Sequence, residues 1–264
     1  MKIIVLGKNG MLGRYVYTYL KSDFNVVGTT RETLVTDDDS LYDLDIYSGD
    51  VIINCIGAIP QRLNTDPRDF YITNTEFPLR LQAFCNSKGA KLIHPSTDCV
   101  YDGSIGNYSE QSEHTATDVY GKSKSLGEPF EATVIRTSIV GEEVVNGLSL
   151  LAWVQSNKNK QIKGFTNHFW NGITCLQFAI ICEEIIKNNM FWQGVKHIHS
   201  PTSVSKYELV KMISRVYDLN IDVLPVETPE LCNKTLTSIK NSVSFKVPEL
   251  EVQLEAQREF FINN

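Results

Sequence analysis

The sequence predicts an α/β protein with a Rossmann-type, doubly wound parallel sheet and a smaller C-terminal lobe. Three observations support this fold class. The chain opens with a short apolar run, a glycine loop and a helix-like segment, in that order. Apolar runs and amphipathic segments then alternate as far as about residue 141, as in repeated β-α units. Beyond residue 141 the alternation becomes irregular, so we expect one domain over residues 1–264 whose sheet core lies mainly in 1–141 and whose lobe lies mainly in 142–264.

The overall composition excludes several classes of protein. The 264 residues carry a formal net charge of −6 and a pI of about 5.4, which argues against nucleic acid as a partner. No apolar run approaches the roughly 18 residues of a membrane span, so we expect no membrane partner. The six cysteines form no CxxC pair and match no zinc pattern, so we expect no metal site. Their apolar neighbours indicate reduced thiols and a cytoplasmic location.

The first element is a strand, Lys2–Leu6, followed by the loop GKNGMLG and a helix. This order is the context that a dinucleotide site requires. Gly7 permits the tight turn, Gly10 lets the backbone approach a pyrophosphate, and Gly13 lets the helix pack close to the strand. The amides at the helix N-terminus then face the phosphates. The predicted cofactor residues here are Gly7, Asn9, Gly10, Met11, Leu12 and Gly13.

The second strand, residues 25–30, sets the cofactor preference. Most NAD-binding proteins place an acidic residue at its end, whereas this chain has Thr29-Thr30-Arg31. Arg31 could pair with a 2′-phosphate, so we favour NADPH. The alternative is that Arg31 is a solvated turn residue and Glu32 faces the ribose, which keeps NADH open. Asp37, in a run that resembles a helix start, is a weaker candidate for an adenine contact.

The next strand, residues 50–55, runs into the small residues Ile56-Gly57-Ala58, which allow close approach of a nucleotide. Residues 71–87 are then expected to form one long helix. A further strand, residues 91–95, ends in Ser96-Thr-Asp-Cys99. Ligands of open α/β sheets bind at this end of the strands, so a hydroxyl of Ser96 or Thr97 could bond to a substrate carbonyl. The alternative is a simple turn.

Tyr120 and Lys124 stand four residues apart at the start of a predicted helix, so they share one helix face. An ammonium beside a phenol favours the phenolate and lowers the phenol pKa toward the working pH. In isolation the pair could equally be two solvated helix residues. The glycine loop and the Ser96-Thr-Asp-Cys99 segment favour the catalytic interpretation.

Together these segments resemble the dTDP-4-dehydrorhamnose reductase group of the extended short-chain dehydrogenases/reductases. The segments occur in the order of that family, over about the first 141 residues. The matching segments are GKNGMLG (7–13), Asn74 in its helix, STDCVYDG (96–103), YGKSKSLGE (120–128) and RTSIVG (136–141).

The resemblance implies NADPH-dependent reduction of the C4 keto group of a 4-keto-6-deoxy nucleotide sugar, dTDP- or UDP-linked, in rhamnose-type biosynthesis. Thr97 would polarise the keto oxygen, Tyr120 would be the general acid, and Lys124 would lower the Tyr120 pKa and hold the nicotinamide ribose. A homodimer is compatible with the family. The implied contacts are Asn74, Tyr120 and Lys124 with the cofactor, and Ser96, Thr97, Asp98 and Tyr120 with the substrate.

Cys99 departs from the group, which commonly has tyrosine there. Related epimerase/reductases place a catalytic cysteine at this spot, so Cys99 could deprotonate the carbon beside the ketone. Equally, it could be a small buried replacement. The loop 164–171 is polar and aromatic, as a nucleotide-sugar contact would be, and Asn167 is its candidate, although the loop could simply be packed. A non-catalytic NADP-binding regulatory subunit and an NAD-retaining epimerase are the remaining alternatives.

Overall fold

The computed structural model describes the chain except residues 35, 37–39, 62–65, 144–146 and 241–243; Asp37 therefore lies outside the described residues. Its centre is a six-stranded sheet in the order β10-β5-β4-β3-β1-β2, in which every neighbouring pair is parallel. This arrangement confirms the predicted fold class. The strands are β1 (Ile3–Leu6), β2 (Val26–Gly28), β3 (Val51–Asn54), β4 (Lys91–Thr97), β5 (Thr133–Thr137) and β10 (Gly194–His197).

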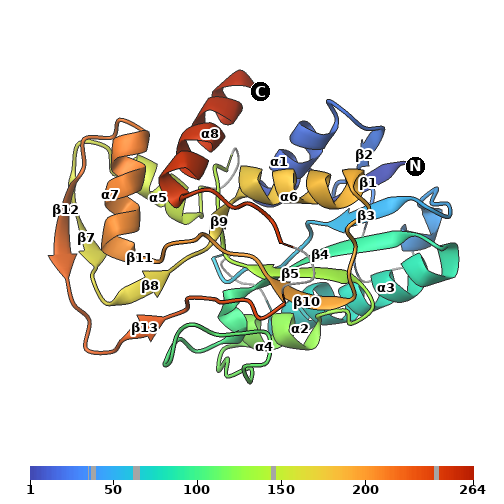
Figure 1. Ribbon diagram of the computed structural model, residues 1–264, viewed down its shortest axis with the longest axis horizontal. Helices are drawn as coiled ribbons and strands as arrows, with labels where there is room; N and C mark the ends of the chain where they lie inside the picture. Colours follow the sequence, from blue (N-terminus) through green and yellow to red (C-terminus); the bar gives the residue numbers. More distant parts are fainter. Residues whose placement is uncertain (35, 37–39, 62–65, 144–146, 241–243) are drawn as a thin grey trace.

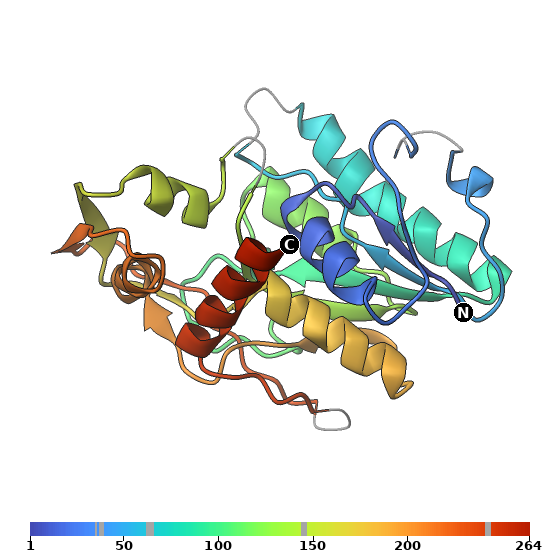
Figure 2. The ribbon, with the colours of Figure 1, turned by 90° about the horizontal axis from the view of Figure 1, so that it is seen from above.

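Helices cover both faces of this sheet (Figures 1 and 2). Successive residues of β1 point to opposite faces, so Ile3 and Val5 belong to one buried cluster while Ile4 and Leu6 belong to the other. A parallel sheet buried on both sides needs such continuous apolar strands. The first cluster lies under α1 (Met11–Leu20) and α6 (Cys175–Lys187), and the opposite face carries α2 (Pro67–Tyr71), α3 (Phe77–Lys88) and α4 (Val119–Leu126).

The long helix expected at residues 71–87 is interrupted. Asp66 caps α2 by accepting from the Arg68 amide at 2.9 Å, and a π-helical turn, η2 (Ile72–Glu76), then joins α2 to α3. Asn74 lies in the middle of this turn. Such π-helical turns are frequent at functional sites. The other short helical turns are η1 (Ser40–Asp43) and η3 (Asp98–Val100).

The lobe forms a second core beside the sheet. Helix α7 packs here with a full capping box, in which Ser205 and Glu208 bond to each other's backbone amides. The small sheets are β11-β8-β13, β12-β7 and β6-β9. The elements are β6 (Ile139–Val140), α5 (Leu150–Ser156), β7 (Gln161–Phe165), β8 (His168–Trp170), β9 (Ile173–Thr174), β11 (Val204–Ser205), α7 (Lys206–Val216), β12 (Asp222–Val226), β13 (Cys232–Asn233) and α8 (Leu250–Asn263).

The chain crosses between sheet and lobe more than once. It leaves the central sheet for the lobe along β6 and returns along β9 into α6 and β10. After β10 it enters the lobe a second time. Strands β6 and β9 pair in parallel, and the Ile173 amide donates to the Ser138 carbonyl at 2.8 Å. The central sheet thus takes its edge strand from beyond residue 141, and the division at that residue stays a proposal. None of the helices in the described ranges is long and apolar enough to cross a bilayer.

Candidate active site

The glycine loop has the geometry that each glycine was expected to provide. Gly7 adopts φ +76°, a left-handed conformation that favours glycine. A Cβ on Gly13 would lie 2.2 Å from the Gly7 carbonyl oxygen, so the helix can approach the strand only with glycine there. At Gly10 the nearest atom to an added Cβ is 3.4 Å away. The protein therefore requires Gly13 for its own packing, whereas Gly10 leaves an open approach to the loop.

The first turn of α1 is suited to bind an anion. Its N-cap is Gly10, which has no side chain to cap the helix, and the first turn carries no acidic residue. The amides of Met11, Leu12 and Gly13 have no partner within the helix, as in any first turn. Free amides and the positive end of the helix dipole fit the pyrophosphate of a dinucleotide.

The end of β2 offers a cation, Arg31, and an acid, Glu32, that is engaged by its neighbour. The Thr29 hydroxyl accepts from the Gly7 amide at 3.2 Å and so ties the strand to the loop. Glu32 accepts a hydrogen bond from the Thr30 hydroxyl, and that bond holds the pKa of the Glu32 carboxyl below its ordinary value. Arg31 is exposed. This arrangement fits a 2′-phosphate better than a 2′-hydroxyl.

Asn74 links the segment after β3 to helix α4. Its side-chain oxygen accepts from the Ala58 amide at 2.9 Å, and its amide group donates to the Ala58 carbonyl at 3.0 Å and to the Ser123 hydroxyl at 3.1 Å. The stretch Ile56-Gly57-Ala58 is thereby held open beside the glycine loop. A direct cofactor contact by Asn74 stays a prediction, because every polar atom of its side chain already has a protein partner.

Helix α4 lies unusually close to its neighbours because its motif contains two glycines. A Cβ on Gly121 would lie 2.3 Å from the Cys99 carbonyl oxygen, and one on Gly127 would lie 1.8 Å from the Asn74 carbonyl oxygen. Asp118 caps the helix by accepting from the Gly121 amide at 2.9 Å. The glycines thus place Tyr120 against the end of β4.

Lys124 is buried and held by a backbone carbonyl. It is 7% exposed, and its ammonium donates to the Pro95 carbonyl at 2.9 Å. The His94 Nε2 lies 3.5 Å from the Lys124 Nζ. Burial lowers the pKa of Lys124 to about 8, while the Glu128 carboxylate opposes the shift.

The buried histidine is oriented by Asn54. The Asn54 side-chain oxygen accepts from the Ile56 amide at 3.1 Å, so its amide nitrogen faces the His94 Nδ1 at 3.2 Å. His94 Nδ1 must then accept, and the ring proton lies on Nε2, toward Lys124. No sequence pattern predicts this partner, because His94 stands in an ordinary strand segment.

Tyr120 lies where the end of β4 meets α4. Its ring packs edge-on against Phe70 at 6.4 Å. Burial raises the pKa of Tyr120 above its ordinary value, Cys99 and Asp98 add to the increase, and a hydrogen bond with Thr97 opposes it. Lys124 is not among the groups that shift the pKa of Tyr120, and in the protein without cofactor the pKa is raised rather than lowered as the sequence led us to expect. A protonated phenol is nevertheless the form that a proton donor needs.

The residues after Thr97 form a buried polar corner. Thr97 accepts from the Cys99 amide at 3.1 Å, and its hydroxyl donates to Asp98 at 3.2 Å. The Cys99 thiol donates to the same carboxylate at 3.6 Å. Burial and then Asp98 raise the pKa of Cys99 to about 12. Near neutral pH this residue is a thiol, which does not favour its use as a base.

A buried ion pair locks the catalytic elements together. Arg136 of β5 is 2% exposed and donates to Glu128 through Nε at 2.8 Å, to the Tyr101 hydroxyl at 2.6 Å and toward the His197 Nε2 at 2.9 Å. Glu128 also accepts from the Ser96 hydroxyl. The pair therefore joins β5, the end of α4 and the end of β4. Ser96 is committed to this network, so its predicted substrate contact remains a prediction.

Asn167 is similarly engaged. Its amide donates to the Thr228 carbonyl at 2.8 Å, and its side-chain oxygen accepts from the Thr228 amide at 3.1 Å. These bonds tie the turn between β7 and β8 to the segment after β12. This structural role is plain, and a substrate contact stays a prediction.

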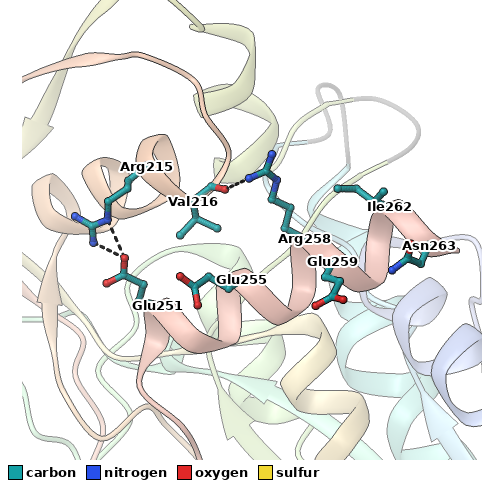
Figure 3. Close-up of a pocket in the computed structure, with 8 residues that line it drawn as sticks. All are labelled: Arg215, Val216, Glu251, Glu255, Arg258, Glu259, Ile262 and Asn263. Carbon is teal, nitrogen blue, oxygen red and sulfur yellow. Dashed lines mark hydrogen bonds and ion pairs between the residues drawn. The ribbon is translucent and has the colours of Figure 1, made fainter.

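One surface hollow lies away from the candidate site. Figure 3 shows it between α7 and α8, with charged side chains along both helices. An ion pair of 2.6 Å between Arg215 and Glu251 spans it. None of the predicted catalytic residues lines it, so we place the candidate site at the carboxyl ends of the sheet strands instead.

Comparison with known proteins gives the family. The model of the RmlD substrate binding domain matches residues 1–246. The chain is 29% identical over 152 residues to a dTDP-4-dehydrorhamnose reductase of Mycobacterium tuberculosis, an alignment that spans 53% of this chain and about half (50%) of the relative.

Solved structures of low identity share the fold. A dTDP-4-dehydrorhamnose reductase from Clostridium acetobutylicum superposes with a TM-score of 0.82 at 21% identity, covering 99% of this chain and 100% of the other. The reductase from Bacillus anthracis, in complex with NADP, gives 0.81 at 20% identity, covering 100% and 99%. With a family match over most of its length and this fold, the chain belongs to the RmlD substrate binding domain family.

Proposed function

We propose that the chain reduces the C4 keto group of a 4-keto-6-deoxy nucleotide sugar, dTDP- or UDP-linked, in rhamnose-type biosynthesis, with NADPH as reductant. One observation carries the proposal. Thr97, the protonated Tyr120 and the buried Lys124 converge at the end of β4, on the same edge of the sheet as an uncapped glycine loop. The dehydrorhamnose reductases named above support the substrate class.

Bound NADPH would supply hydride to the keto carbon. The chain's own residues then have separate tasks. The Thr97 hydroxyl and the Tyr120 phenol donate hydrogen bonds to the keto oxygen as negative charge grows there. Tyr120 gives up its proton to that oxygen, and the positive charge on Lys124 stabilises the phenolate left behind. The Arg136–Glu128 pair holds β4, β5 and the end of α4 in position.

The substrate test is a paired assay of NADPH oxidation. One reaction holds a 4-keto-6-deoxy sugar nucleotide alone, and the other holds the same compound treated with a separate 3,5-epimerase; both run in D₂O with wild type and Cys99→Ser. We expect turnover of the epimerised compound, unchanged by Cys99→Ser and without deuterium beside the ketone. Absence of NADPH oxidation with both dTDP and UDP compounds would reject the proposed reaction.

The cofactor preference rests on Arg31. Arg31→Ala should lower kcat/KM for NADPH by about tenfold, since a charged hydrogen bond contributes about 1.5–3 kcal/mol, and leave kcat/KM for NADH unchanged. Arg68→Ala, at an exposed position on α2, is the matched control. Equal losses with both cofactors would show that Arg31 does not read the 2′-phosphate. We place the reaction in the cytoplasm, where the free cysteines stay reduced.

A further inference from the structure

Two lysines of the lobe face the catalytic corner from either side of β8. Lys206 follows β11 directly, and Lys234 follows β13 directly. Both strands pair with β8, and Ser205 and Asn233 are both register partners of Phe169. Continued by one residue, the antiparallel pairing puts Lys206 beside His168, and the parallel pairing puts Lys234 beside Trp170. The two lysines are therefore two positions apart along β8, on one face of this small sheet.

Contacts fix the direction of both side chains. The Asn233 amide donates to the Gly103 carbonyl at 2.6 Å, and a Cβ on Gly103 would lie 3.1 Å from the Lys234 Cγ. Lys234 thus lies against the loop that follows η3. The Lys206 ammonium lies over the Trp170 ring, 5.1 Å from its centre. Both side chains are half-buried.

Both ammonium groups interact electrostatically with the buried polar corner that follows Thr97. Burial raises the pKa of Asp98, and Lys234 and then Lys206 oppose that shift. The charge of Lys234 also interacts with Cys99 and Asp118, and both of these groups raise the pKa of Tyr120. The two lysines therefore lie close to the reacting centre.

Neither lysine has an anionic partner. Among the residues that the structure describes, no hydrogen bond from either ammonium and no ion pair within 4.0 Å is formed. Asp98, whose charge interacts with both lysines, is 3% exposed and is engaged by Thr97 and Cys99. Each lysine also repels the other. Burial lowers the pKa of Lys206, so its charged form would gain from an anion. Burial also acts on Lys234, but Cys99 and Asp98 outweigh it and hold the pKa of that lysine above its ordinary value.

We propose that Lys206 and Lys234 form a binding site for an anionic oxygen group of the nucleotide sugar, either its diphosphate or a carboxylate on the hexose. The proposal rests on the proposed function only in taking a nucleotide sugar as the ligand of this cleft. Both lysines lie outside the sequence motifs, so the proposal adds residues for substrate selection that those motifs do not contain.

Calorimetric titration at saturating NADP⁺ tests the site. The variants are Lys206→Met and Lys234→Met, with Lys211→Met, an exposed lysine of the same helix, as control. The ligands are dTDP, UDP, UDP-glucose and UDP-glucuronic acid. Each active-site variant should weaken binding by about tenfold, as expected for a charged hydrogen bond. Binding of NADP⁺ should be unchanged.

The ligand series separates the two sources of the anion. Equal weakening for the nucleoside diphosphate and both sugars assigns the site to the diphosphate. Weakening for UDP-glucuronic acid alone, with UDP and UDP-glucose unchanged, assigns it to a hexose carboxylate. Affinities within twofold of Lys211→Met for every ligand would overturn the proposal.

Two further measurements keep the test decisive. Lys206→Arg and Lys234→Arg retain the charge and should restore binding to within about threefold, and wild-type affinity should fall as NaCl rises from about 50 to 500 mM. Because titration needs no turnover, the two proposals fail separately. Loss of binding in the methionine variants without any NADPH oxidation leaves the site standing and rejects the reaction.

Discussion

The candidate site has a sheet wall, at the ends of β4 and β5, and a lobe wall, around β8, and the polar groups of these two walls differ in their bonding. On the sheet side, the polar groups of Asn74, Ser96, Glu128 and Arg136 bond to other protein groups. On the lobe side, Lys206 and Lys234 make neither a hydrogen bond nor an ion pair within the described part of the chain. The difference indicates a division of labour. The sheet wall has its hydrogen bonds in place before substrate arrives, and under our proposal the ligand would complete the lobe wall.

The sharpest test of the sheet wall is its proton donor. Tyr120→Phe should lower kcat by about 10²–10⁴-fold, the usual contribution of general acid catalysis, and leave the NADPH dissociation constant within twofold. Stopped-flow NADPH oxidation and fluorescence titration measure the two quantities. Tyr42→Phe, at an exposed tyrosine, is the control. A variant that keeps a tenth or more of the wild-type kcat would mean that the proton comes from elsewhere.

The rigidity of that wall depends on its buried ion pair. Arg136→Met leaves Glu128 unpaired and should lower the free energy of unfolding by about 3–5 kcal/mol, because an uncompensated charge stays buried. Arg215→Met removes one partner of the exposed pair with Glu251 and should cost at most about 1 kcal/mol. Urea unfolding of both variants makes the comparison. Similar losses would show that the Arg136 network is not a special source of stability.

Lys124 gives the sheet wall a pH signature. The folded protein releases the Lys124 proton near pH 8, whereas the unfolded chain holds it up to the ordinary value of 10.5. Unfolding between these values takes up a proton, so raising the pH stabilises the fold, by about 3 kcal/mol over the whole window. The unfolding free energy of wild type minus that of Lys124→Met should therefore increase between pH 8 and pH 10.5. A constant difference contradicts this.

The glycine loop allows packing and cofactor approach to be told apart. Gly13→Ala should destabilise the protein by about 1–3 kcal/mol, since its Cβ meets the Gly7 carbonyl at 2.2 Å. Gly10→Ala has room in the protein and should unfold within about 1 kcal/mol of wild type, but should bind NADPH more weakly. Thermal unfolding and cofactor titration decide. Unchanged NADPH binding by Gly10→Ala would place the pyrophosphate elsewhere.

Local sequence patterns predicted the sheet wall well. The fold class followed from the strand–glycine loop–helix order, and the needs of Gly7 and Gly13 appear as expected, because close backbone approach leaves a glycine in the sequence. Close backbone approach also explains why glycine stands at 121 and 127, although only the structure shows this. The single helix expected at 71–87 is interrupted by a π-helical turn, which the periodicity of the sequence cannot reveal. Gly127 packs against Asn74 in this turn.

The lobe wall could not be predicted in the same way. Lys206 and Lys234 meet only because two short strands pair with β8, and no spacing in the sequence encodes that pairing. The burial of His94 and Arg136 likewise depends on tertiary packing, which the local sequence does not show. Asn167 was chosen for its polarity, yet its bonds go to Thr228 and Glu230, so composition alone could not distinguish a ligand contact from a turn.

The parallel pairing of β6 with β9 has a consequence for protein engineering. Because the chain enters the lobe twice, the lobe is encoded by two separate stretches of the gene, on either side of α6 and β10. A chimaera that exchanges one contiguous C-terminal segment would also replace the edge strand of the host sheet. Recombination that transfers substrate preference between relatives therefore needs two exchanges, and the Ser138–Ile173 hydrogen bond joins the two ends of the first exchanged stretch.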